Sequence, residues 1–264
     1  MSDLRYALRD SATMLRRYLR HLRRYPAMAG MLVGMPVVFL LIFVYVFGAT
    51  LGAGLGEAST GRTAYIAYVT PGIILMTVAV AATATAVSVC TDLTEGIVAR
   101  FRTMAIWRPS VLAGHVAGSL IQALLAMTVV TGVAVLIGFR PPADLAQWLA
   151  AIGVLALFVL AITWLSVTLG LLAKTPETAS NTPMPLMLLP FLGSGFVPTA
   201  SMPAGLRWFA EYQPFTPVIN AVRALLLARP AGDNVIVAVA WSAGIGLASY
   251  LWARRLYNRD LVSA

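Results

Sequence analysis

Six long stretches without a charged residue constrain the fold of this chain more than any other feature of its sequence. Each stretch holds between 20 and 32 residues, and all 29 Asp, Glu, Lys and Arg lie outside them. A helix of about 20 apolar residues is long enough to cross the hydrocarbon core of a bilayer. The sequence therefore predicts an all-α polytopic membrane protein and excludes a soluble enzyme. The stretches are 25–56, 63–91, 109–139, 145–173, 178–206 and 234–253.

The apolar parts of these stretches predict six transmembrane helices in a single domain over residues 1–264. The stretch from Ala27 to Leu51 is longer than the roughly 7–15 apolar residues of a signal peptide, so we expect it to be a retained helix. Pro183, Pro185 and Pro190 are expected to kink or break the fifth helix. The expected spans are 27–51, 65–90, 111–138, 147–172, 180–197 and 235–253.

The basic residues predict the orientation of the six spans. If the chain crosses the membrane at each of the six spans, both termini and every second connecting segment lie on the same side. These segments hold 14 of the 19 Lys and Arg. Because basic residues collect in cytoplasmic loops, both termini are expected in the cytoplasm. The net charge of +9 follows this placement and does not indicate a nucleic-acid partner. The four basic segments are 1–26, 91–110, 173–180 and 254–264.

The N-terminal segment 1–26 has the pattern of a basic amphipathic helix. Leu4, Leu8 and Leu15 follow helical spacing along one stripe, and most of the arginines fall outside that stripe. A helix of this kind lies in the membrane interface and faces anionic lipid headgroups. An ordinary solvated helix that leads into the first span is the alternative.

Two connecting segments differ from simple loops. Over 91–107 we expect a short cytoplasmic helix that Thr91 or Asp92 caps, with Glu95 in the capping-box position. This helix would offer a docking surface, and a solvated hairpin between spans is the alternative. Over 198–230 we expect an outer hairpin of two amphipathic pieces, Ala204–Tyr212 and Pro217–Leu227, that dips partly into the outer leaflet.

The chemistry that is missing from the chain bears directly on its energy source. The only lysine, Lys174, lies in Ala-Lys-Thr-Pro, so the chain has no P-loop for ATP. The expected spans contain no Asp, Glu, Lys or Arg, whereas transporters driven by protons generally use ionisable groups inside the bilayer. A transporter of this composition needs an external motor.

Other catalytic readings receive little support. A single cysteine, Cys90, excludes a disulfide within the chain and a metal site of several cysteines. Gly193-Ser194-Gly195 resembles the serine of intramembrane proteases, which also need a histidine base on another span. His115 is expected near the cytoplasmic end of the third span and Ser194 near the outer end of the fifth, which makes this pairing implausible.

Two blocks of residues resemble the characteristic stretches of one family of membrane proteins. The first block is Asp92-x-x-Glu95-Gly96-x-x-x-Arg100-Phe101-Arg102-x-x-x-Ile106 with Leu112-x-Gly114. The second runs from Leu189-Pro190-Phe191-Leu192-Gly193-Ser194-Gly195-Phe196-Val197-Pro198, through Met202-Pro203 and Leu206-x-x-Phe209, to Gln213-Pro214-Phe215-Thr216-Pro217 and Arg223. In this order, and with six spans, the chain resembles ABC-2 type permeases, closest to their daunorubicin-resistance branch. It departs from that family at Met104-Ala105, where Leu-Pro is frequent, and at Gln213, where Asn is frequent.

The resemblance implies a permease subunit of an ATP-binding cassette exporter in the bacterial cytoplasmic membrane. Such a subunit has no catalytic residues, cofactor or metal of its own. It pairs with a second permease, here expected as a homodimer, and with two copies of a separate ATPase that binds ATP and Mg²⁺. The substrate would be a hydrophobic or amphipathic compound such as a drug, an antibiotic or a lipid-like molecule.

The resemblance also assigns roles to particular residues. The segment 91–107 would be the coupling helix that sits on the ATPase, and 198–230 would gate the exit. In a dimer, spans one, two and five would line the substrate pathway, although packing against lipid or other helices is the favoured explanation for each of those side chains taken singly. The ATPase-coupling residues are Asp92, Glu95, Gly96, Arg100, Phe101 and Arg102. The pathway residues are Met35, Phe39, Phe43, Met187 and Phe191, and the outer-gate residues are Pro198, Phe209, Pro214 and Arg223.

Three alternatives to drug export remain open. A related ABC-2 permease could export a lipid or glycan precursor. A secondary transporter could use an ion gradient, although the absence of intramembrane carboxylates argues against it. The chain could also be a noncatalytic membrane scaffold or immunity subunit.

Overall fold

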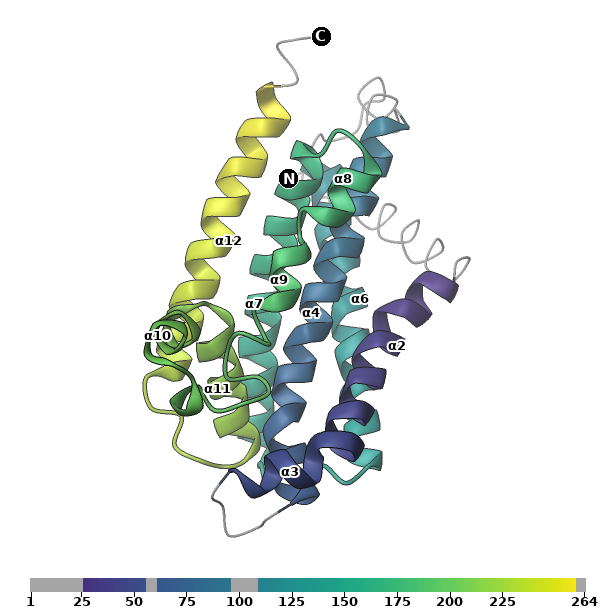
Figure 1. Ribbon diagram of the computed structural model, residues 1–264. Coiled ribbons are helices and arrows are strands. Elements are labelled where there is room, and N and C mark those ends of the chain that lie inside the picture. The colour runs from purple at the N-terminus through teal and green to yellow at the C-terminus, as the bar shows by residue number, and fades with distance from the viewer. Residues whose placement is uncertain (1–25, 56–60, 96–108, 260–264) are drawn as a thin grey trace.

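The computed structural model describes residues 26–55, 61–95 and 109–259, and these ranges contain helices and connecting turns but no strand. Long helices run side by side along one axis (Figure 1). We call the end of the bundle where α4 (Arg62–Thr94) ends and α6 (Pro109–Leu136) begins the upper end. The lower end is where α6 ends and α7 (Leu145–Leu172) begins.

Five helices among the described residues are long and apolar enough to cross a membrane. They correspond to the expected spans one to four and six, with ends that differ from the expected ones by between zero and six residues. The expectation of an all-α polytopic membrane protein is thereby confirmed. The five helical stretches are Gly30–Ala53, Arg62–Thr94, Gly114–Leu136, Leu145–Leu172 and Asn234–Leu256.

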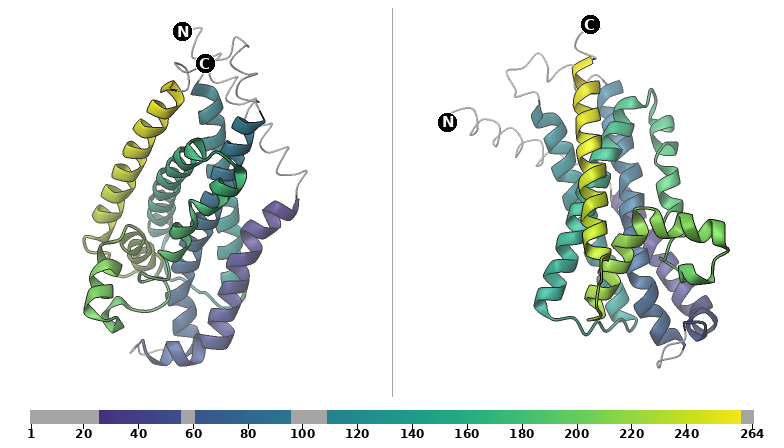
Figure 2. Two further views of the ribbon diagram at one scale, coloured as in Figure 1. Left: turned by 45° about the horizontal axis from the view of Figure 1, so that its top comes forward. Right: turned by 90° about the vertical axis from the view of Figure 1, so that its left-hand side faces the viewer.

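The helix α4 lies at the centre of the bundle. In its most apolar stretch 72% of the residues are buried, compared with 22% in the first span and 17% in α12 (Asn234–Arg259). Figure 2 shows α12 at the edge of the bundle, on the opposite side from α2 (Pro26–Ile42). The outward faces of α2 and α12 are therefore available to lipid or to another protein chain.

The first span is not a regular α-helix throughout. After α2 comes one π-helical turn, η1 (Phe43–Phe47), and then the short helix α3 (Gly48–Ala53). A π-helical turn inserts an extra residue into the backbone repeat, and such turns occur often at functional sites. No pattern in the sequence indicated this turn.

The upper end of α4 corrects one expectation. Thr91 and Asp92 do not cap a new helix, because α4 continues through both residues to Thr94 and Glu95 follows its last residue. The physical reason is that neither proline nor glycine interrupts the chain between Gly72 and Gly96, so the transmembrane helix extends beyond the apolar stretch. The expected helix over 1–26 lies outside the described residues except for Pro26, and residues 96–107 of the expected coupling helix also lie outside them.

The fifth apolar stretch is not one continuous helix over 180–197. It forms α8 (Pro176–Asn181), α9 (Met184–Leu188) and then an unwound stretch that we define as residues 189–197. The break was expected, because a proline inside a helix removes a backbone hydrogen bond and its ring clashes with the preceding turn. Pro183 stands between the two short helices, and Pro190 lies just after the second.

This broken segment runs along α4. Near the upper end the thiol of Cys90 donates to the carbonyl oxygen of Ala173 (3.4 Å). Further down, the hydroxyl of Tyr65 donates to the carbonyl oxygen of Phe196 (3.1 Å). Cys90 and Tyr65 are about 37 Å apart along a helix, which exceeds the roughly 30 Å thickness of a bilayer core.

Beyond the unwound stretch, a short 3₁₀ turn, η2 (Thr199–Ser201), leads to two helices that match the expected amphipathic pieces. The first, α10 (Ala204–Tyr212), has the expected bounds, and the second, α11 (Phe215–Leu226), begins two residues earlier and ends one residue earlier than expected. The helix α10 is largely exposed, whereas α11 buries Phe215, Ile219 and Val222 between α4, α7 and α12.

Candidate functional site

A group of polar side chains lies inside the apolar bundle, where α4, the unwound stretch and α11 meet. Polar groups are expensive in a membrane interior and mark functional sites more often than not. We call this group the polar cluster, and it consists of Tyr65, Tyr68, Ser194, Gln213, Thr216, Asn220 and Arg223.

The half-buried guanidinium of Arg223 connects the three elements of the polar cluster. Its Nη2 donates to the carbonyl oxygen of Ser194 (2.6 Å), and its Nε donates to the carbonyl oxygen of Tyr68 (3.1 Å). Its Nη1 donates to Oδ1 of Asn220 (2.9 Å), one turn earlier on α11. The guanidinium carbon also lies 3.9 Å from the centre of the Tyr68 ring, in cation–π contact.

The backbone of Ser194 has left the helical pattern, and side chains satisfy its polar groups. Its carbonyl oxygen accepts from the Tyr68 hydroxyl (3.0 Å) as well as from Arg223, and its N–H donates to Oγ1 of Thr216 (3.3 Å). Its own hydroxyl donates to Asn220 (2.7 Å). Irregular backbone is tolerated at membrane depth when protein groups cover it in this way.

Gln213 closes the upper side of the polar cluster. Its Nε2 donates to the carbonyl oxygen of Leu189 (3.1 Å) and to Oγ1 of Thr216 (2.9 Å). Its Oε1 accepts from the N–H of Phe215, the first residue of α11. The glutamine that stands where ABC-2 permeases often have asparagine therefore joins the unwound stretch to the start of α11.

Two glycines let the unwound stretch approach its neighbours. A Cβ atom on Gly72 of α4 would lie 2.4 Å from the carbonyl oxygen of Gly195, and a Cβ atom on Gly193 would lie 2.3 Å from Nε2 of Gln213. Both distances are far below van der Waals contact. The two sides of the Gly72–Gly195 contact come from segments that only the tertiary structure brings together.

Phenylalanines from the first span and the unwound stretch form an aromatic cluster beside the polar cluster. The centre of the Phe191 ring lies 5.7 Å from that of Phe39 and 4.4 Å from that of Phe196. Phe43, the first residue of the π-helical turn, lies 4.5 Å from Phe196. Of the expected pathway residues, the structure thus brings Phe39, Phe43 and Phe191 together, and it adds Phe196.

The two methionines of the expected pathway differ in burial. Met187 on α9 is half-buried against the core, and Met35 on α2 is 45% exposed on the outward face. The pathway assignment of all five residues stays a prediction.

Of the expected coupling residues, Asp92 and Glu95 lie at the upper end of α4, where Glu95 is exposed. The carboxylate of Asp92 pairs with Nε2 of His115 on α6 (3.1 Å). Sequence reasoning missed this pair, although the two residues border the same connecting segment. The other four, Gly96, Arg100, Phe101 and Arg102, lie outside the described residues.

The expected outer-gate residues are dispersed. Arg223 belongs to the polar cluster, Pro214 precedes α11, half-exposed Pro198 precedes η2, and Phe209 is 40% exposed on α10. The sequence signals for this region were its prolines, its two amphipathic pieces and the family pattern that includes Arg223. Those signals did not indicate which partners Arg223 would bind.

The structure also excludes the pairing of Ser194 with His115 as a serine protease site. Ser194 lies at the level of Tyr68, and His115 lies at the level of Asp92. Tyr68 and Asp92 belong to the same helix, α4, and are about 36 Å apart along it. No proton transfer between Ser194 and His115 is possible over that distance.

The described residues form a bundle of apolar helices with a broken segment that polar side chains hold, which is the architecture of an integral membrane protein. The sequence model of the family described as "ABC-2 type transporter" matches residues 11–227. The chain therefore belongs to the ABC-2 type transporter family. Members of this family are transmembrane subunits that work with ATPase activity on a separate ABC subunit, in a bacterial membrane that they cross several times.

Relatives within the family carry names that refer to drug resistance. The chain is 28% identical over 196 residues to the daunorubicin resistance ABC transporter permease protein DrrB1 of Streptomyces coeruleorubidus. The aligned region covers 74% of this chain and 69% of that protein. It is 25% identical over 177 residues to the probable doxorubicin resistance ABC transporter permease protein DrrC of Mycobacterium tuberculosis, covering 67% of this chain and 64% of that protein. The resemblance seen in the two sequence blocks is confirmed.

Proposed function

We propose that this chain is the permease subunit of an ATP-binding cassette exporter that moves a hydrophobic or amphipathic compound out of the cell. A second copy of the chain and two copies of a separate ATPase, which binds ATP and Mg²⁺, complete the complex. The family membership and the names of the relatives support this proposal. The absence of charged residues from the expected spans supports an energy source on another subunit.

The proposal includes a topology of six crossings with both termini in the cytoplasm. The broken segment 173–197 is the fifth crossing, because it accompanies α4 over more than the thickness of a bilayer core. The upper end is then cytoplasmic, in accord with the distribution of arginines. Residues 198–230 form the outer re-entrant hairpin, and α11 is its buried arm.

The polar cluster is the observation that carries the proposed mechanism. The central helix α4 has Asp92 at the end nearest to the ATPase and Tyr68 in the polar cluster. A tilt of α4 at the cytoplasmic end therefore moves the groups that hold Ser194 and Arg223 at the outer end. The unwound stretch and α11 follow α4, so ATP-driven closure of the motor reaches the exit gate.

The aromatic cluster supplies a surface for an apolar substrate in this mechanism. Phe39 and Phe43 on the loosely packed first span meet Phe191 on the segment that α4 moves. Movement of the unwound stretch separates or joins these rings. An opening between the first and fifth crossings would connect the outward face of α2, where Met35 lies, with the interior.

Glu95→Arg tests the proposal at its coupling end. We expect this variant, assembled with its ATPase in liposomes, to lose at least 90% of export and the stimulation of ATP hydrolysis by substrate. The reason is that Glu95 is exposed where α4 leaves the bundle, so reversal of its charge removes an orienting contact without disturbing the core. Export and hydrolysis are measured in the same preparation.

Glu177→Arg is the matched control for this experiment. Glu177 is also an exposed carboxylate at the upper end, but it belongs to α8 and lies outside the coupling segment. Export by Glu177→Arg is expected to stay near that of the unaltered chain. Full export by Glu95→Arg would contradict the coupling assignment.

The same reconstituted complex identifies the substrate class. Stimulation of hydrolysis by aromatic drugs supports a drug exporter, and stimulation by lipid or glycan precursors alone would assign the chain to the other kind of ABC-2 permease. Transport that persists without ATP and collapses with the proton gradient would replace the whole proposal by a secondary transporter.

A further inference from the structure

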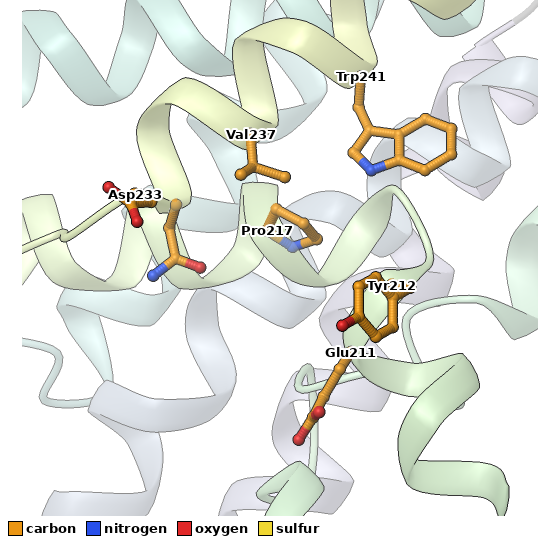
Figure 3. Close-up of a pocket in the computed structure, with 7 residues that line it drawn as sticks. Glu211, Tyr212, Pro217, Asp233, Val237 and Trp241 are labelled. Carbon is orange, nitrogen blue, oxygen red and sulfur yellow. The ribbon is translucent and has the colours of Figure 1, made fainter.

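A pocket at the lower end of the bundle lies apart from the polar cluster and has no part in the proposed mechanism. It has a volume of about 400 Å³ and is bounded by the end of α10, the first turn of α11 and the first two turns of α12 (Figure 3). Pockets that hold drug-sized molecules begin at roughly 300 Å³. Its lining includes two acidic side chains, two aromatic ones and no basic residue.

The two carboxylates of the pocket differ in how far they are neutralised. Glu211 pairs with Arg207 one turn earlier on α10, with 2.7 Å between its Oε1 and Nε of the arginine. Asp233 is exposed at the start of α12, and its carboxylate makes no hydrogen bond or ion pair with any residue in the described ranges. The carboxylate of Asp233 therefore has no ion-pair partner in the part of the chain that the structure describes.

The aromatic residues of the pocket present free ring surface. Tyr212 is 64% exposed and Trp241 is 40% exposed. Figure 3 places their side chains on one side of the pocket and Asp233 on the other, with Pro217 and Val237 between them. An aromatic body can therefore lie against Tyr212 and Trp241 while a positive group extends toward Asp233.

We propose that this pocket binds an organic ammonium ion that carries an aromatic or other apolar body. The rings of Tyr212 and Trp241 stack on the apolar body, the carboxylate of Asp233 balances the charge of the ammonium group, and Pro217 and Val237 contact the part between the two. Such an ion can come from water as a cationic amphiphile, or from the bilayer as the headgroup of phosphatidylethanolamine. Binding needs neither the ATPase nor transport, so this proposal stands independently of the proposed function.

Binding of a charged probe and of its neutral twin tests the proposal. The purified full-length chain is placed in nanodiscs of phosphatidylglycerol, and equilibrium dialysis measures binding of a naphthylmethyl-trimethylammonium salt. The neutral twin carries a tert-butyl group in place of the trimethylammonium group, and empty nanodiscs give the background. We expect saturable binding of the cation and binding of the neutral twin that is at least tenfold weaker.

Two variants are expected to change the affinity for the cation in opposite directions. Asp233→Asn should weaken it about fivefold, because it removes the negative charge of that carboxylate. Arg207→Gln should tighten it about two- to fivefold, because it frees the carboxylate of Glu211. Neither variant should alter binding of the neutral twin or the melting temperature, since both positions are exposed.

Nanodiscs that also contain phosphatidylethanolamine separate the two sources of the ammonium group. A several-fold loss of probe affinity in that lipid identifies its headgroup as the occupant, and an unchanged affinity identifies a cationic amphiphile from water. The proposal is overturned if the cation shows no saturable binding or binds no better than its neutral twin. It is overturned equally if Asp233→Asn and Arg207→Gln leave the affinity unchanged.

Discussion

Gly72→Ala is expected to destabilise the protein by about 1–3 kcal/mol and to abolish export, although it adds only one methyl group. That methyl group would lie 2.4 Å from the carbonyl oxygen of Gly195 and within 2.8 Å of two further backbone atoms. A backbone cannot yield as the tip of a side chain can. The unwound stretch must therefore move away from α4, and the polar cluster must separate with it.

The control for Gly72→Ala is the same substitution at Gly153. Gly153 lies in the middle of α7, where a Cβ atom would meet nothing within 4 Å. There the change should be neutral or slightly stabilising, because alanine favours helices more than glycine does. Thermal unfolding in detergent and export in liposomes measure both variants. Equal melting temperatures for the two variants would show that the close approach at Gly72 has no energetic role.

Arg223→Gln is expected to lower export at least tenfold while most of the protein still folds. Glutamine retains a polar group but has neither the reach nor the three-sided donor geometry that joins Ser194, Tyr68 and Asn220. The carbonyl oxygen of Ser194 then loses its charged donor, and a hydrogen bond to a charged group contributes about 1.5–3 kcal/mol. The outer hairpin and α4 would no longer move together.

Three comparisons make the Arg223 result specific. Arg223→Lys should recover only a small part of export, because an ammonium group cannot reproduce the planar fork of a guanidinium. Tyr68→Phe, which removes one neutral donor to Ser194, should cost about 1 kcal/mol and leave most of the export. Arg140→Gln, at an exposed position in the lower loop, should have no effect. Full export by Arg223→Gln would remove the polar cluster from the mechanism.

The sequence predicted the long helices well, because a transmembrane helix is a local matter of length and composition. The spans over 27–51, 65–90, 111–138, 147–172 and 235–253 all correspond to helices of the structure. The fifth stretch was as apolar as the others, and only its three prolines indicated the break. The path of the backbone after the break could not be predicted. It depends on which neighbouring side chains form hydrogen bonds with the backbone N–H and C=O groups that the break leaves unpaired.

The candidate site was predicted only in fragments. Arg223 was named from its place in a family pattern, yet its acceptor on Tyr68 is 155 residues away in the sequence. Ser194 attracted attention for a protease motif, whereas its actual role is to accept Arg223 and Tyr68 at its carbonyl oxygen. The spacing of residues along a chain predicts contacts within one helix or between paired strands, where the backbone geometry repeats. It does not predict contacts between segments that are far apart in the sequence.

The six uncharged stretches alone determined that this chain belongs in a membrane. That conclusion follows from the cost of a charge in hydrocarbon, which acts on each segment separately. Only the tertiary structure decided that α4 is the central helix, that Gly72 faces Gly195, and that Arg223 holds the unwound stretch in place. Those features depend on backbone groups that lose their helical hydrogen bonds where the helix is broken. Packing among segments that are distant in the sequence determines which groups become the new hydrogen-bond partners.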